Sequence, residues 1–296
     1  MKRFVEFAAI VAVIVAVAGC SRKPPQKFVP DDPAPAIPAL RTGPAVAQAA
    51  DSPAADTFSI VPEGTWKLSI DRQVFMRSTS MATTTVKSTT SLTMKVTDST
   101  AASCSVSITD AESTFVALEP RDNIQEDVAA TYRGLTFTIE PGIDGLVMIR
   151  PKDGRQVPEE LSEALALMIP PFNPALMRPS ESRAASRSVF PGLPGGRDDG
   201  GVLSGQWKLD DGAGGRGVLA LDFSAAVKGE ATIESIHGRV TGGERRGRSL
   251  CAFGPTGLTG AGMAESGVYS VELKPRKGKT RLLEQKVTVR ASLGPA

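Results

Sequence analysis

Cys20 is the residue whose position most clearly predicts chemistry. It directly follows Ala18-Gly19 and ends an apolar run that starts at Phe4, behind the basic pair Lys2-Arg3. Basic, apolar and small residues in this order are typical of an export signal with a cleavage site, and the run is short for a membrane span. After cleavage the Cys20 thiol could carry an acyl chain. The alternative is a short hydrophobic anchor with an incidental cysteine.

The segment Val17-Ala18-Gly19-Cys20 resembles the lipobox of bacterial lipoproteins. The resemblance implies signal cleavage between Gly19 and Cys20, a diacylglycerol on the sulfur and a further acyl chain, such as palmitate, on the new amino terminus. Several chains anchor a protein stably, whereas one alone is marginal. Ser21 follows the cysteine, which by the same resemblance favours the outer over the inner membrane. Membrane lipid is therefore the first predicted partner, through acylated Cys20.

The remaining catalytic inventory is small. His237 is the single histidine, so clusters of histidine ligands are excluded and a Ser-His-Asp triad would depend on this residue. Gly212–Gly217 matches Gly-x-Gly-x-x-Gly, but a strand-like run follows it where a dinucleotide site needs a helix. The pairs Asp198-Asp199 and Asp210-Asp211 lack the spaced carboxylates of a calcium loop. We expect no enzyme activity, no metal and no cofactor.

Two further groups of residues each allow two interpretations. Arg245, Arg246 and Arg248 cluster with Glu244 in a glycine-rich stretch, which is either a solvated loop or a contact for a phosphate or lipid headgroup. Cys104 and Cys251 either form a disulfide, as exported proteins allow, or are separate buried thiols.

The composition favours strands and turns. The chain has 29 Gly, 22 Pro and only 5% aromatic residues, and its formal net charge is +2. A nearly neutral protein has no global electrostatic attraction to nucleic acid, so no nucleic-acid partner is predicted.

Period-two alternation is the clearest structural pattern. From 82 to 97 every odd residue is polar and every apolar residue is even, which predicts a strand with one wet face. Its length predicts either a bend near Ser88 or a long curved strand. The alternation returns at 102–108, with Cys104 pointing inward, and at 135–140. Further strands are predicted at 143–149, 216–223, 230–237, 269–274 and 284–293, the last two joined by a turn at 275–278.

One amphipathic helix is predicted near 158–169. Pro158 suits the first helical position, acidic residues follow it, and Pro170-Pro171 end the helix. Leu161, Leu165 and Met168 lie on one apolar stripe. The stripe packs either as core against a sheet or as a lid over an apolar groove.

These elements predict five segments: a signal peptide at 1–19, a lipidated cysteine and Pro/Ala-rich disordered tether at 20–60, a β-rich half with the helix at 61–169, a Pro/Gly-rich linker at 170–201 and a second β-rich half at 202–296. Both tryptophans occur in a Gly-x-Trp-Lys-Leu block, Gly64–Leu68 and Gly205–Leu209, which indicates either a divergent duplication or a chance match.

The predicted fold class is mainly β, with curved antiparallel sheets, half-barrel or sandwich-like, in two similar halves. This layout, together with Arg248–Gly257, loosely resembles an uncharacterised family of envelope lipoproteins, which implies an architecture and no site. We expect a non-catalytic, membrane-anchored protein that binds a hydrophobic or lipid ligand in a curved sheet. The alternative is a structural or assembly lipoprotein that contacts only other envelope proteins.

Overall fold

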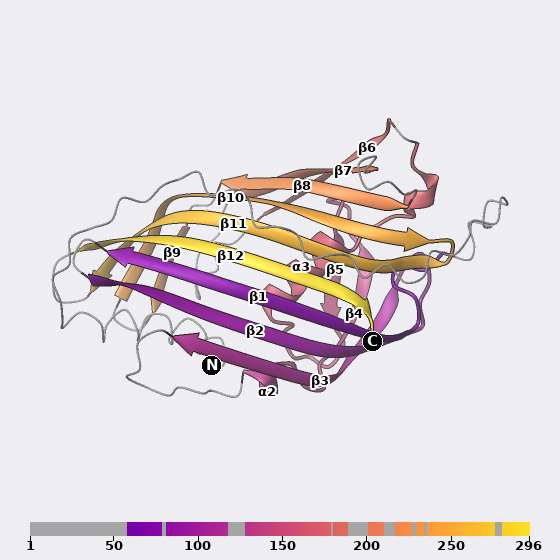
Figure 1. Cartoon of the computed structure of the whole chain (residues 1–296), viewed down its shortest axis with the longest axis horizontal. Coiled ribbons are helices and arrows are strands. Elements are labelled where there is room, and N and C mark those ends of the chain that lie inside the picture. The colour runs from indigo at the N-terminus through magenta and orange to yellow at the C-terminus, as the bar shows by residue number, and fades with distance from the viewer. Residues whose placement is uncertain are drawn as a thin grey trace.

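The structure is a computed structural model. It describes residues 58–78, 81–117, 128–178, 180–188, 201–209, 217–226, 229–233, 236–275 and 280–296. These residues form one 12-stranded antiparallel sheet with the path β5-β4-β3-β2-β1-β12-β11-β10-β8-β7-β6, and β9 pairs with β10 beside it. The predicted class, mainly β with curved antiparallel strands, is confirmed. The sheet is continuous and open, which fits the half-barrel alternative (Figure 1).

The strands span Gly64–Ser78 (β1), Met81–Thr97 (β2), Cys104–Ala117 (β3), Thr136–Pro141 (β4), Val147–Pro151 (β5), Ser182–Ser188 (β6), Val202–Leu209 (β7), Val218–Ala226 (β8), Gly229–Ile233 (β9), Ile236–Gly254 (β10), Gly257–Pro275 (β11) and Arg281–Pro295 (β12). The helices span Ala129–Tyr132 (α2), Glu159–Met168 (α3) and the 3-10 turn Pro174–Leu176 (η4).

Strand β2 is the long strand that its alternation predicts. Val86, Leu92, Met94 and Val96 are buried, whereas the lysines at 87 and 95 are exposed. Its pairing with β1 runs from Met81 to Val96, so the strand curves without a break at Ser88. Alternation persists because each inward side chain packs inside the curved sheet while each outward one meets water.

Strand β3 changes phase once. Cys104 and Ile108 are buried, and the register with β2 shifts so that Asp110 faces Thr93 while Ile108 faces Met94. The extra residue, Thr109, is a β-bulge, after which the buried position becomes odd, at Ala111. A bulge bends a strand, which helps the sheet to curl.

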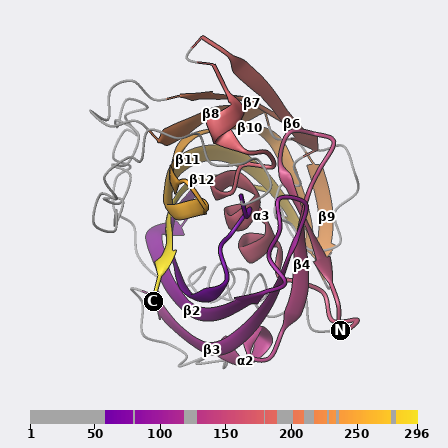
Figure 2. The ribbon, with the colours of Figure 1, turned by 90° about the vertical axis from the view of Figure 1, so that its right-hand side faces the viewer.

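Helix α3 lies inside the curl (Figure 2). Pro158 is its N-cap, so the helix starts one residue later than predicted, and Glu159 and Glu160 occupy its first turn. It ends at Met168 because Ile169 is extended and Pro170 has no N–H for a further turn. The helix contacts β5, β10 and β11.

Three predicted boundaries are wrong. Phe58 and Ile60 are buried and Ser59 bridges to Gly257, so packed structure begins before residue 61. Ser182–Ser188, within the predicted linker, is the edge strand β6, because its small residues can pair with β7. The glycine-rich stretch with the arginines is part of β10, held by two neighbouring strands.

The two halves share the sheet, since β1 pairs with β12. Each half is a meander, and both meanders advance along the sheet in the same direction. Five antiparallel pairings separate β1 from β7, so these strands run in opposite directions. Strands that advance in the same direction but start with opposite chain directions cannot be superposed with the same face inward. The two Gly-x-Trp-Lys-Leu blocks therefore do not open two equivalent strand arrangements.

A clasp joins the two edges of the sheet at one end. It is the turn between β4 and β5, Gly142–Leu146. The Trp207 indole N–H donates to Gly145 O at 2.9 Å, and the Ser186 N–H donates to Asp144 O at 2.8 Å. Arg187 also lies 3.8 Å from the Asp144 carboxylate. The clasp thus ties the β4–β5 edge to the β6–β7 edge.

Candidate functional site

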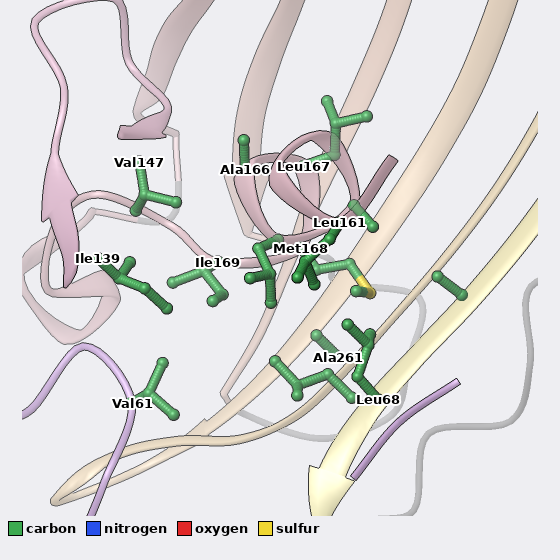
Figure 3. Close-up of a cluster of buried hydrophobic side chains, with 14 of the residues drawn as sticks. Val61, Leu68, Ile139, Val147, Leu161, Ala166, Leu167, Met168, Ile169 and Ala261 are labelled. Atoms are coloured by element: carbon green, nitrogen blue, oxygen red, sulfur yellow. The ribbon is translucent and has the colours of Figure 1, made fainter. Parts of the chain in front are cut away.

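Helix α3 fills one end of the interior. Leu161, Leu165 and Met168 are buried, as their stripe predicts, but Ala166 and Leu167 on the other side are buried as well. Figure 3 shows Ala166 and Leu167 on the side of the helix away from Met168, and Ile169 directed toward Ile139 and Val61. Ala164–Met168, the second half of α3, is apolar all round, and such a segment is enclosed by its neighbours. This helix is core packing in the structure, and the arrangement does not resemble a surface lid.

The two cysteines are free thiols buried in separate contacts. Cys104, on β3, lies opposite Ile139 of β4, whereas the Cys251 thiol, on β10, donates to Met168 O of α3 at 2.8 Å. Cys104 and Cys251 are therefore two separate buried thiols, and they do not form a disulfide with each other. Burial raises the pKa of Cys104 to about 12 and also raises the pKa of Cys251, which keeps both thiols protonated and unreactive.

A buried ion cluster links α3 to the sheet. Arg245, 5% exposed, donates from Nε to the Glu265 carboxylate at 2.8 Å and from a terminal nitrogen to the Glu163 carboxylate at 2.6 Å. A second terminal nitrogen of Arg245 also contacts Glu265. Arg245 comes from β10, Glu265 from β11 and Glu163 from α3. Both carboxylates are thus engaged by one guanidinium.

Burial and charge act in opposite directions on this cluster. Burial lowers the pKa of Arg245, but Glu265 and Glu163 outweigh it and keep the guanidinium charged. Burial raises the pKa of Glu265, and the Arg245 charge only partly offsets this. Burial also raises the pKa of the neighbouring Tyr269 phenol to about 12. A buried ion cluster of this kind contributes little stability, because desolvation opposes the Coulomb attraction.

Glycines on the inner face make room for the aromatic rings around Arg245. A Cβ at Gly243 or Gly267 would lie 2.6 or 2.5 Å from Tyr269, and one at Gly247 would lie 2.3 Å from the Phe223 ring. The rings therefore occupy space that a side chain at these glycines would need, and the Arg245 guanidinium lies 6.0 Å from the centre of the Phe223 ring. The glycines that suggest a loop in the sequence are packing positions in the structure.

The inner face is apolar beside the ion cluster on β1 and β2, and past it on β11 and β12. We call the following residues the distal section: Val74, Met76, Val86, Val271 and Leu283. Each is at most 4% exposed, yet none belongs to the core cluster that surrounds α3. Figure 1 shows the long strands continuing past α3 toward β9. Arg72 stands at the border, two residues before Val74 on the same face of β1.

Several residues singled out in the sequence lie elsewhere. In β10 the Cα of His237 is paired with those of Lys274 and Thr232. Gly19, Cys20, Ser21, the two Asp-Asp pairs and most of the Gly-x-Gly-x-x-Gly match are outside the described residues. Within the described ranges, no three His, Cys, Asp or Glu residues gather as a metal site. No helix there is both long and apolar enough to cross a membrane.

The sequence did not reveal Arg72, Glu163, Glu265 and Tyr269 as neighbours. Arg72 lies in β1, for which no alternation is predicted, Tyr269 lies at the start of the strand predicted at 269–274, and Glu163 is one of the acidic residues that follow Pro158. One usable signal existed: Glu265 interrupts the apolar run Ala261–Ala264, and a lone carboxylate beside a buried run needs a cationic partner. The distance of 20 residues to Arg245 gave no hint of which cation it is.

No protein-family model and no curated protein matches this chain. Among solved structures, lipovitellin, in a structure of its lipid–protein interactions, is similar to 78% of this chain at 9% identity with a TM-score of 0.42. The chain spans 25% of that lipovitellin chain. The Pseudomonas aeruginosa outer membrane protein OpdK is similar over 77% of this chain and 99% of its own, at 6% identity with a TM-score of 0.19. OpdQ of the same organism gives the same TM-score, 0.19.

Proposed function

We propose that this protein is a non-catalytic lipoprotein of the cell envelope that binds a hydrophobic ligand inside its curved sheet. Cys20 carries the anchor, and the residues between it and Phe58 connect the membrane to the sheet. Ser21 after the acylated cysteine favours the outer membrane. The anchor rests on the segment Val17-Ala18-Gly19-Cys20, which has the residue types of a lipoprotein cleavage site.

The observation that supports ligand binding is the distal section. The inner face of the sheet remains apolar past the end of its core helix, and these side chains, which are covered from water, are the lining that an enclosed hydrophobic ligand would contact. A ligand there would lie along β1 and β2, beside the ion cluster. The end that contains α3 is already filled by side chains.

The anchor is tested by Cys20→Ala. The variant should accumulate as an uncleaved precursor and lose metabolic labelling by fatty acid, and Ser21→Ala, which leaves the thiol in place, should be cleaved and labelled like wild type. Labelling of Cys20→Ala, or a mature terminus at any residue other than 20, would refute the anchor.

Ligand binding is tested by extracting lipids from the purified protein and by adding a fluorescent fatty acid. Val74→Asp, in the distal section, should reduce uptake, whereas Gln73→Asp, exposed on the opposite face, should not. Equal uptake by both variants would place the ligand elsewhere. No bound lipid and no uptake by wild type would reject ligand binding.

The second candidate is a structural or assembly lipoprotein. The burial of Ala164–Met168, the second half of α3, favours it, because an interior filled by a helix needs no ligand for its stability. Covalent crosslinking in intact cells, followed by identification of crosslinked envelope proteins, would support this candidate where lipid extraction finds nothing.

A further inference from the structure

Arg72, on the inner face of β1, is a half-buried charged side chain without an ion pair among the described residues. Its Nε is buried and has no hydrogen-bond partner, and the described part of the chain places no carboxylate within 4.0 Å of it. A buried guanidinium N–H without an acceptor loses the hydration it has in water, which is costly. The position therefore calls for an acceptor.

The carboxylates nearest to Arg72 are already engaged. Arg72 and Glu265 lie in one row across the sheet, with Val289 of β12 between them. The Glu265 carboxylate accepts its hydrogen bond from Arg245, and Arg72 acts on Glu265 through its charge. Glu163 is likewise bound to Arg245. The interior thus contains two guanidinium groups, and both described carboxylates are bound to the same one.

The surroundings of Arg72 are polar on one side and apolar on the other. Across the sheet, Arg72 lies in the row of Glu265, and the next inward residues of β1, Val74 and Met76, lie in the rows of Arg245 and Tyr269. The facing strands β10 and β11 thus carry the polar groups, and β1 continues from Arg72 with apolar side chains. From Arg72 to Ser78 strand β1 spans roughly 20 Å at about 3.4 Å per residue. An acyl chain of one membrane leaflet covers about 15 Å, half of a hydrocarbon core of about 30 Å. The distal section is long enough for one such chain.

We propose that Arg72 binds the anionic oxygen headgroup of an amphipathic lipid whose acyl chain lies along the distal section. The guanidinium offers planar donors to a carboxylate or phosphate, and charge-assisted bonds of this kind are the strong ones. The inference rests on the proposed ligand binding and adds the class of ligand and its orientation. The headgroup faces the ion cluster, and the tail points away from α3.

The test compares two ligands with the same chain and different headgroups. Displacement of a fluorescent fatty acid by oleate and by oleyl alcohol is measured on the full chain in a non-ionic detergent. Arg72→Gln should weaken oleate about ten- to hundredfold and leave oleyl alcohol nearly unchanged, since it removes one charged bond. Arg72→Lys should restore part of the loss. Arg290→Gln, which removes an exposed arginine of neighbouring β12, is the matched control and should change neither ligand.

The outcomes separate this inference from the proposed function. If wild type binds oleyl alcohol as tightly as oleate, or if Arg72→Gln weakens both ligands equally, the headgroup site is wrong while ligand binding stands. If wild type binds neither, the proposed ligand binding itself fails. The wild-type comparison needs no variant, so the inference stays testable even where Arg72→Gln does not fold. Lysophosphatidic acid with the same oleoyl chain distinguishes a preference for phosphate from one for carboxylate.

Discussion

Gly145→Ala should open the clasp between the two edges of the sheet. Gly145 has φ +76°, a conformation that costs an L-residue about 1–2 kcal/mol. The new Cβ would lie 2.0 Å from Ala184 O, a backbone atom of β6 that cannot turn aside. The turn must therefore shift and release the Trp207 indole N–H, which is buried, and the Ser186 N–H. Leaving a buried donor unpaired costs about 1–3 kcal/mol, so strain and the lost Trp207 bond together cost roughly 2–5 kcal/mol.

Gly154→Ala is the matched control, since Gly154 has φ +73° and nothing within 4 Å of an added Cβ. Both variants pay the same conformational strain, and only Gly145→Ala disturbs the clasp. Denaturant unfolding followed by tryptophan fluorescence measures the difference and also reports on Trp207 directly. We expect Gly154→Ala to lose about 1 kcal/mol. Equal losses for the two variants would mean that the clasp does not hold the sheet edges together.

Three further predictions concern the interior. Leu165→Ala, at 0% exposure inside the curl, should cost roughly 2–5 kcal/mol of unfolding free energy, and a loss below about 1 kcal/mol would mean that α3 is loosely packed. Arg245→Leu should lower the free energy of unfolding by about 3–5 kcal/mol, because it leaves two carboxylates without their partner. Arg246→Leu, whose exposed partner is Glu244, should lower it by less than about 1 kcal/mol. Similar losses for the two variants in chemical denaturation would contradict the buried cluster. Maleimide should modify neither described thiol in the folded protein and both after unfolding. Burial raises the pKa of Cys104 to about 12, whereas a free thiol has a pKa of 9.0, so the thiol ionises first in the unfolded state. The free energy of unfolding should therefore fall as the pH rises above 9, and it should fall less steeply in Cys104→Ala. An identical slope in the variant would contradict the burial of Cys104.

Alternation and helical spacing predicted the parts of the fold whose inner face is apolar throughout. In β2 the inner positions from Val86 to Val96 are apolar, serine or threonine, and in α3 a stripe of leucines and a methionine follows a proline and two glutamates. These patterns reflect burial on one face, which depends on local sequence alone. The pairing of β1 with β12, and the clasp against β6, join residues far apart in the chain. No local pattern encodes such a pairing, so the continuity of the sheet could not be predicted.

The stretch from 243 to 249 in β10 was misread for a reason tied to the candidate site. Its inner positions are Gly243, Arg245, Gly247 and Ser249, and its outer positions, Glu244, Arg246 and Arg248, are all charged, so neither face is apolar. An inner face that binds ions and leaves room for aromatic rings cannot also be apolar, so the period-two signal vanishes where the interior is polar. A failure of sequence patterning is expected where residues serve a role other than packing. The segment of β10 that lacks the period-two pattern carries Arg245, and the neighbouring strand β11 carries Glu265. The interruption of the hydrophobic pattern therefore marks, in both strands, the polar belt on which the proposed headgroup site borders.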